Sequence, residues 1–308
     1  MGSGGDDGAT TQLMKVDLRG LQPNTMAWMN AMVAVTASMT AHGYVVVVHD
    51  ALDAELRCAL FGHALPELFG LPFDTKKRSG VFSNGPHGGY DGEVPNQILE
   101  SIPILNPAEP GNIQDFVGRL WPQGNPGFCD TIESFAKNVL EMAQTVERMT
   151  LEGLGVCEES IAWQLSSQSH TIKMMLYGTP PDNAELSLGA HPDGQMTTVI
   201  VQHEVGGLEV KVDGGRWLAV PPEPGTLIVM GAPPSGHKRF SVLLNRRRKG
   251  DPMLRAMDEL VDEDHPLMYN PCRHEDYRAF RFSEEGCRLQ EHNPLKAFCG
   301  VETHGSKE

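Results

Sequence analysis

A strand-rich run between positions 188 and 241 constrains the fold of this chain more than any other stretch. Its apolar and alternating segments are TTVIVQ at 197–202, LEVKV at 208–212, WLAV at 217–220 and LIVM at 227–230. Tight-turn residues such as the DGG at 213–215 separate them. Short β-branched segments joined by such turns are typical of antiparallel strands. We therefore expect an antiparallel β-core of the small-barrel or jelly-roll type.

The same run carries side chains that bind metals. His191 and Asp193 are two residues apart, so on a strand both point to one side and can converge on one ion. A bare His-x-Asp is more often a capped turn or a solvated pair, but strand ends in a small barrel favour the metal site. His237 is the candidate third ligand. Two histidines and a carboxylate on one face of an octahedron form the non-haem Fe(II) triad, which leaves room for a bidentate co-substrate and O2.

Motifs along nearly the whole chain resemble one family. They are ALPELFGLPFDTKKR at 64–78, VGGLEV at 205–210, PPEPGTLIVM at 221–230, ELVDEDHPL at 259–267 and PLKAFCGV at 294–301. The chain resembles the plant 2-oxoglutarate- and Fe(II)-dependent dioxygenases, and among them the branch that modifies glucosinolate side chains. The resemblance implies an α+β fold, with a double-stranded β-helix (jelly-roll) core flanked by N-terminal helices.

The resemblance also implies roles for single residues. It places the iron ligands at His191, Asp193 and His237, and the residues that bind 2-oxoglutarate at Arg239, Ser241 and Tyr177. The expected reaction uses Fe(II), 2-oxoglutarate and O2, with ascorbate as a further cofactor candidate. It would hydroxylate or desaturate a small specialised metabolite or hormone-like molecule and convert 2-oxoglutarate to succinate.

The segment at 73–93 is rich in Gly, Ser and Asn, and in folds of this class such segments often border the substrate. His87 and Tyr90 in this segment are candidate substrate contacts, although a plain connecting loop is an equally good interpretation. Pocket loops do not encode a ligand, so the substrate stays open.

One departure from the family pattern affects the candidate site. His237 and Arg239 are only two apart, whereas in the family they lie on separate strands with a turn between them. A strand of about 5–6 residues and a hairpin loop do not fit between them. The shortened segment predicts lost backbone partners for the strands at 227–230 and 240–244. We expect Arg239 and Ser241 to keep register, because the apolar residues beside them lock that strand into the core, and His237 to leave ligand range. The opposite outcome is the alternative.

The shortened segment also raises a second hypothesis. A splice variant, a gene-model error or a decayed paralogue would each produce such a shortened segment. The product would be a catalytically impaired or inactive homologue that acts at most as a binding module.

The remaining segments suggest three parts. Residues 1–12 are Gly-rich and acidic, so we expect a disordered start without a signal peptide. Residues 13–165 predict a mostly helical region, with a first helix capped by Asn24 and helices at 113–120, 126–154 and 158–168. Residues 166–308 would form the β-core and a C-terminal extension. The first helix carries Met26, Met29, Met32 and Val33 at helical spacing, and the cations at 246–249 predict a solvated loop.

Composition excludes several classes of protein. The 308 residues carry a formal net charge of -15, which argues against a nucleic-acid partner because phosphate binding needs clustered cations. No apolar run approaches the length of a bilayer span, so we expect no membrane partner. The 6 cysteines lack C-x-x-C spacing and favour reduced thiols in the cytoplasm. We expect a monomer that acts on a small molecule.

Overall fold

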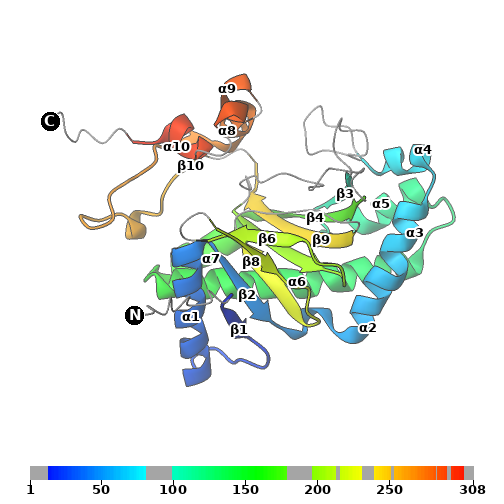
Figure 1. The fold of residues 1–308 in the computed structure, drawn as a ribbon, viewed down its shortest axis with the longest axis horizontal. Coiled ribbons are helices and arrows are strands. Elements are labelled where there is room, and N and C mark those ends of the chain that lie inside the picture. Colours follow the sequence, from blue (N-terminus) through cyan, green and yellow to red (C-terminus); the bar gives the residue numbers. More distant parts are fainter. Residues whose placement is uncertain are drawn as a thin grey trace, which may run out of the picture.

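A mixed sheet of seven strands forms the centre of the molecule, with strand order β1-β2-β8-β5-β9-β4-β3 (Figure 1). The computed structural model describes residues 13–80, 99–178, 196–212, 216–230, 239–250, 253–281, 283–289 and 293–301, with the backbone alone at Leu99, Arg239 and Cys287. The strands are β1 (Lys15–Asp17), β2 (Tyr44–Val48), β3 (Leu99–Leu105), β4 (Gln168–Tyr177), β5 (Thr197–Gln202), β8 (Thr226–Met230) and β9 (Arg239–Arg248). All neighbours are antiparallel except β1 and β2.

A hairpin covers one side of this sheet. It consists of β6 (Leu208–Lys211) and β7 (Trp217–Val220), which pair antiparallel. Its side chains Leu208, Val210 and Val220 pack in one apolar cluster with Ile200 and Ile228 of the large sheet. We call the side of the sheet that faces these residues the hairpin side. The two layers form the expected jelly-roll core of an α+β fold.

Helices cover the opposite side of the sheet, which we call the helix side. The long helix α6 (Pro126–Gly153) runs behind the strands in Figure 1, as the sequence predicts. Asn125 caps it by accepting a hydrogen bond from the Phe128 N–H. Its buried face packs against sheet residues such as Val199 and Val242. The helices α5 (Asn112–Leu120) and α7 (Glu158–Ser166) also lie where the sequence predicts them.

The helical segment before residue 70 is interrupted. It consists of α2 (Ala54–Arg57), a π-helical segment (Cys58–Ala64) and α3 (Leu65–Gly70). It is followed by α4 (Phe73–Lys76). A π-helical turn breaks the usual i to i−4 pattern of backbone hydrogen bonds.

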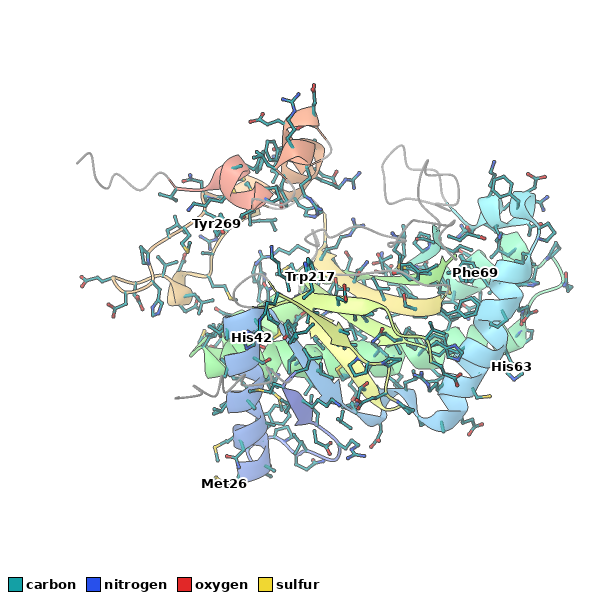
Figure 2. All side chains as sticks on the ribbon, viewed as in Figure 1. Met26, His42, His63, Phe69, Trp217 and Tyr269 are labelled. Atoms are coloured by element: carbon teal, nitrogen blue, oxygen red, sulfur yellow. The ribbon has the colours of Figure 1, made fainter. Side chains whose placement is uncertain are left out.

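The first helix, α1 (Met26–His42), differs from the prediction at its start and in its buried face. Thr25, not Asn24, is the N-cap, and its hydroxyl accepts from the Trp28 N–H. The buried positions are Trp28, Ala31, Val35 and Ser38. The predicted apolar residues are largely outside, since Met26 is 69% and Val33 64% exposed. Figure 2 shows Met26 at the outer end of this helix.

The prediction that two strands lose their backbone partners is wrong. β8 pairs with β2 and β5, and β9 pairs with β4 and β5. Both strands are antiparallel to β5, so Met230 and the start of β9 lie at opposite ends of the sheet, about 20 Å apart along the strands. The nine peptide steps from Met230 to Arg239 reach at most about 30 Å. The short connection therefore suffices without removing either strand from the sheet.

The basic run is also not a solvated loop. β9 continues through Arg248, and it pairs with β4 up to the Gln168–Arg248 pair. Arg246 points to the helix side and is 0% exposed. Strand alternation turns Arg246 toward the helix side and buries it, which the composition of the run did not reveal.

The C-terminal pieces lie apart from the sheet in Figure 1. They are β10 (Met253–Leu254), β11 (Cys272–Arg273), α8 (His274–Arg281), α9 (Glu284–Arg288) and α10 (Pro294–Cys299). Cys299 is buried, as expected of a small apolar residue. Over the described ranges, none of the helices is long and apolar enough to cross a bilayer.

Candidate functional site

The hairpin side of the sheet carries the candidate co-substrate residues. On β9, Val242 and Leu244 pack with the helices, so Ser241 between them in the alternation points to the hairpin side. On β4, Ile172 and Met174 pack with the helices, so Tyr177 also faces the hairpin side. Two of the three predicted residues therefore share one interior face.

Ser241 and Tyr177 are both buried, at 0% and 3% exposure. The Ser241 Oγ has no hydrogen-bond partner among the described residues. The Tyr177 hydroxyl donates to the Met175 Sδ at 3.5 Å. Since a buried hydroxyl without a partner is costly, the Ser241 Oγ suits a polar ligand that enters this space.

Arg239 lies at the start of β9, where its backbone pairs with that of Tyr177. Met175 pairs with Ser241 in the same ladder. Residues opposite each other in an antiparallel pair project to the same face. Arg239 and Ser241 therefore lie on one strand that pairs with β4 along its length, and the Arg239 side chain lies outside the described part of the chain.

The candidate iron ligands His191, Asp193 and His237 lie outside the described residues, as do the candidate substrate contacts His87 and Tyr90. Within the described ranges, three or more His, Cys, Asp or Glu side chains do not gather as a metal site would require. The metal centre is therefore a prediction from the donor types at 191, 193 and 237, and two imidazoles with one carboxylate suit Fe(II).

A buried ion pair on the helix side fixes the strand that follows the His-x-Asp motif. Glu147 of α6 lies 2.7 Å from the Arg246 Nη1. It also accepts hydrogen bonds from the Thr197 Oγ1 at 2.5 Å and the Gln168 Nε2 at 3.0 Å. One carboxylate thus joins β4, β5 and β9. Thr197 begins β5 four positions after Asp193, so this network anchors the chain close to the predicted ligands.

A second cluster lies at the opposite end of β5. The Arg57 Nη2 donates to the carbonyl oxygens of Gln202 and His203, at 2.9 Å each. The His203 ring stacks on Phe61 with centroids 4.7 Å apart. Burial lowers the pKa of His203. A neutral imidazole therefore packs beside the first residues of β9, and Arg57 closes the end of the β5 strand.

Gln202 is a buried polar residue of the hairpin side that the sequence analysis missed. It is 4% exposed, pairs with Ser241 across the strands, and its Nε2 donates to the Val220 carbonyl oxygen at 3.0 Å. This bond ties the large sheet to the hairpin beside Ser241. The alternation of TTVIVQ could have assigned Gln202 to the same face as Thr198. Nothing in the local sequence indicates that Gln202 binds the Val220 carbonyl oxygen.

Two histidines outside the motif have structural or surface positions. The His49 Nδ1 accepts from the Ala51 N–H at 2.8 Å and caps a short helical turn. His63 is exposed and lies at the outer edge of the molecule in Figure 2. Neither is placed to contribute to the interior of the jelly roll.

Comparison with known proteins agrees with this geometry. Residues 164–243 match the model of the 2OG-Fe(II) oxygenase superfamily. A probable 2-oxoglutarate-dependent dioxygenase of Arabidopsis thaliana, AOP1.2, is 29% identical over 303 residues, which cover 89% of this chain and 92% of that protein. A probable inactive AOP2 from the same plant is 25% identical and covers 91% and 95%.

Solved structures show the same fold. The rice dioxygenase for auxin oxidation aligns with a TM-score of 0.76 at 22% identity, over 94% of this chain and 100% of that chain. JOX2, solved with 2OG, Fe and JA, aligns with a TM-score of 0.70 at 20% identity, over 89% and 86%. The family model and these relatives together support a plant 2-oxoglutarate- and Fe(II)-dependent oxygenase of the AOP-like branch.

Proposed function

We propose that this protein is an Fe(II)- and 2-oxoglutarate-dependent dioxygenase that oxidises a small organic molecule. The observation that carries the proposal is the buried Ser241 hydroxyl, which lacks a hydrogen-bond partner among the described residues and faces the interior of the jelly roll. It stands on a strand whose register also sets Arg239 beside Tyr177. This arrangement suits a carboxylate that arrives with the co-substrate.

The residues fit the distal carboxylate of 2-oxoglutarate. A guanidinium matches a carboxylate with two parallel hydrogen bonds, so Arg239 would supply the charge. The Ser241 hydroxyl would donate a further hydrogen bond. The Tyr177 hydroxyl, which now donates to a thioether, would gain a stronger acceptor. Each of these residues binds and orients the dicarboxylate, and the apolar hairpin layer keeps water away from it.

His191, Asp193 and His237 would hold the metal. When bound, Fe(II) supplies the chemistry that activates O2 and couples the decarboxylation of 2-oxoglutarate to oxidation of the substrate. The protein contributes ligand positions and a dry interior. The Glu147 network fixes the start of β5, four positions after Asp193 in the sequence.

The place of His237 distinguishes two arrangements of this centre. If it binds iron, the His237→Ala protein loses Fe(II) affinity as strongly as His191→Ala. If Arg239 and Ser241 keep register at the expense of His237, only the variants of the first two ligands lose affinity. Anaerobic Fe(II) titration of the three variants separates these outcomes.

The alternative is an inactive homologue, and one relative is indeed described as probably inactive. The strands on both sides of the shortened segment keep two backbone partners each, so the core shows no damage from it. This observation favours the active enzyme.

The relatives indicate only the broad class of the substrate. Of two proteins with the same fold, one is a dioxygenase for auxin oxidation and the other was solved in complex with JA. We propose a specialised metabolite or hormone-like molecule of similar size, with His87 and Tyr90 as candidate contacts. A cytoplasmic location and a monomeric state also belong to this proposal. The 5 described cysteines, which are all free, support the cytoplasmic location.

Turnover of 2-oxoglutarate tests the proposal. Purified protein supplied with Fe(II), ascorbate and O2 should convert 2-oxoglutarate to succinate, slowly alone and faster with a substrate drawn from a panel of plant metabolites. Asp193→Ala should abolish succinate formation, and omission of Fe(II) should have the same effect. Succinate formation that persists in Asp193→Ala would contradict the assignment of the metal site.

A further inference from the structure

A second buried hydroxyl faces the same interior space as Ser241. Ser101 lies on β3, is 0% exposed, and its Oγ has no hydrogen-bond partner among the described residues. Its neighbours Ile102 and Ile104 show which way the strand faces, because both pack with the helices. Ser101 therefore points to the hairpin side. A hydroxyl buried without a partner in the chain indicates a partner that the chain does not supply.

The sheet register places the two serines in one row. Ser101 pairs with Met175 on β4, and Met175 pairs with Ser241 on β9. Directly opposed residues of antiparallel strands lie about 4.5–5.5 Å apart. Ser101 and Ser241 thus lie on either side of Met175, each one strand away from it.

A third hydroxyl reaches the same row. Tyr177 belongs to the next row on the same face, and its hydroxyl donates to the Met175 Sδ. The Met175 thioether, which is a weak acceptor, thus binds the Tyr177 hydroxyl at the position in the ladder between the two serines. Arg239 pairs with Tyr177, which adds a cationic residue at the edge of this group. Hydroxyl donors, with an arginine at this position of the ladder, suit a carboxylate rather than a cation.

We propose that Ser101 is a further co-substrate-binding residue, whose hydroxyl donates to the distal carboxylate of 2-oxoglutarate from the side opposite Ser241. This inference rests on the proposed function, since it assigns a further contact to the same ligand. It extends the co-substrate site to β3, a strand outside the matched residues 164–243.

Binding and stability together test this role. The full-length protein is loaded with Fe(II) without O2 and titrated calorimetrically with 2-oxoglutarate, as wild type, Ser101→Ala and Ser241→Ala. Ser101→Ala should weaken binding about tenfold, as expected for one hydrogen bond to a charged group. Its melting temperature should be equal to or above that of the wild type, because the lost hydroxyl has no partner in the chain.

Ser38→Ala is the matched control. Ser38 is buried at 1% exposure, but its Oγ donates to the Tyr44 carbonyl oxygen at 2.7 Å, on the helix α1. This variant should lose melting temperature and keep the wild-type affinity for 2-oxoglutarate. A second probe, 2-oxobutyrate, lacks the distal carboxylate, so Ser101→Ala should bind it as the wild type does.

Three results would overturn the inference. Ser101→Ala could bind 2-oxoglutarate as tightly as the wild type while Ser241→Ala binds weakly. It could lose affinity for 2-oxobutyrate to the same extent, which would place its effect elsewhere. It could also melt at a lower temperature, which would reveal a partner within the chain. If the wild type itself fails to bind 2-oxoglutarate, the proposed function fails first, and the inference fails with it.

Discussion

The Arg246 guanidinium is fully buried on the helix side of β9, where Glu147 of α6 is its charged partner. Burial lowers the pKa of Arg246, and the Glu147 carboxylate acts in the opposite direction. A buried pair of this kind contributes little net stability, but removal of one partner leaves the other charge uncompensated. The pair therefore fixes the position of α6 against β9 and β5 more than it adds to the free energy of folding.

Arg246→Met should consequently lower the free energy of unfolding by about 3–5 kcal/mol, as measured by urea denaturation. Arg288→Met is the control, because Arg288 pairs with Glu284 at the exposed surface and is itself 73% exposed. Its free energy of unfolding should stay within about 0.5 kcal/mol of the wild type. Equal stability of the two variants would show that the buried pair does not hold the sheet to α6.

His170 on β4 lies close to the cations Arg246 and Lys249. Burial, together with Arg246 and Lys249, lowers the pKa of His170 to about 4, whereas an unfolded histidine has a pKa of about 6.5. Between these values the unfolded chain binds the proton more readily, so falling pH favours unfolding. Stability should therefore decrease as the pH drops from about 6.5 to about 4.

The comparison with His170→Gln isolates this effect from the titration of carboxylates. Between pH 7 and pH 4 the wild type should lose about 1–2 kcal/mol more unfolding free energy than the variant, a range reduced for partial solvent screening. Parallel pH profiles of the two proteins would mean that His170 does not titrate as described.

At the scale of elements, the helix α1 shows which features its sequence left undetermined. Apolar residues lie on more than one side of it, since Trp28 and Val35 are buried whereas Met26 and Val33 are exposed. Periodicity cannot choose a face when apolar residues surround the axis. Contact with α6 makes the choice, because the Trp28 Nε1 donates to Glu152 and the Thr36 Oγ1 to the Met149 carbonyl oxygen.

Two valines of α1 test this packing. Val35 is 0% and Val33 64% exposed, so Val35→Ala should lower the free energy of unfolding by roughly 1–3 kcal/mol and Val33→Ala by less than about 0.5 kcal/mol. Urea denaturation of both variants measures the difference. A larger effect at Val33 would mean that α1 packs through its methionine face instead.

The strands were predictable because short β-branched and apolar runs bounded by turn residues form buried strands. The run TTVIVQ became β5, and LIVM became part of β8. The burial of Arg246 was not predictable from the sequence. The strand continues past its apolar part, and Arg246 is buried there because Glu147 of α6 pairs with it. This partner is distant in sequence, so the composition of the basic run does not indicate it.

At the scale of the whole molecule, the candidate site combines what short motifs predict with what only the fold reveals. The R-x-S pair and Tyr177 were predicted from resemblance, and the ladder of β4 and β9 brings Tyr177 and Ser241 to one face. Ser101 carried no motif, because its place beside Met175 depends on the pairing of β3 with β4. The strand pairing also shows that the shortened segment leaves the large sheet intact.

We propose that this intact core holds a working iron centre built on His191 and Asp193. The most direct measurement is the amount of Fe(II) bound per chain under anaerobic equilibrium dialysis. The wild type should bind one Fe(II) per chain, and His191→Ala and Asp193→Ala should each bind almost none while they keep the wild-type circular dichroism spectrum. A folded wild-type protein that binds no Fe(II), or variants that bind it as well as the wild type, would contradict the claim.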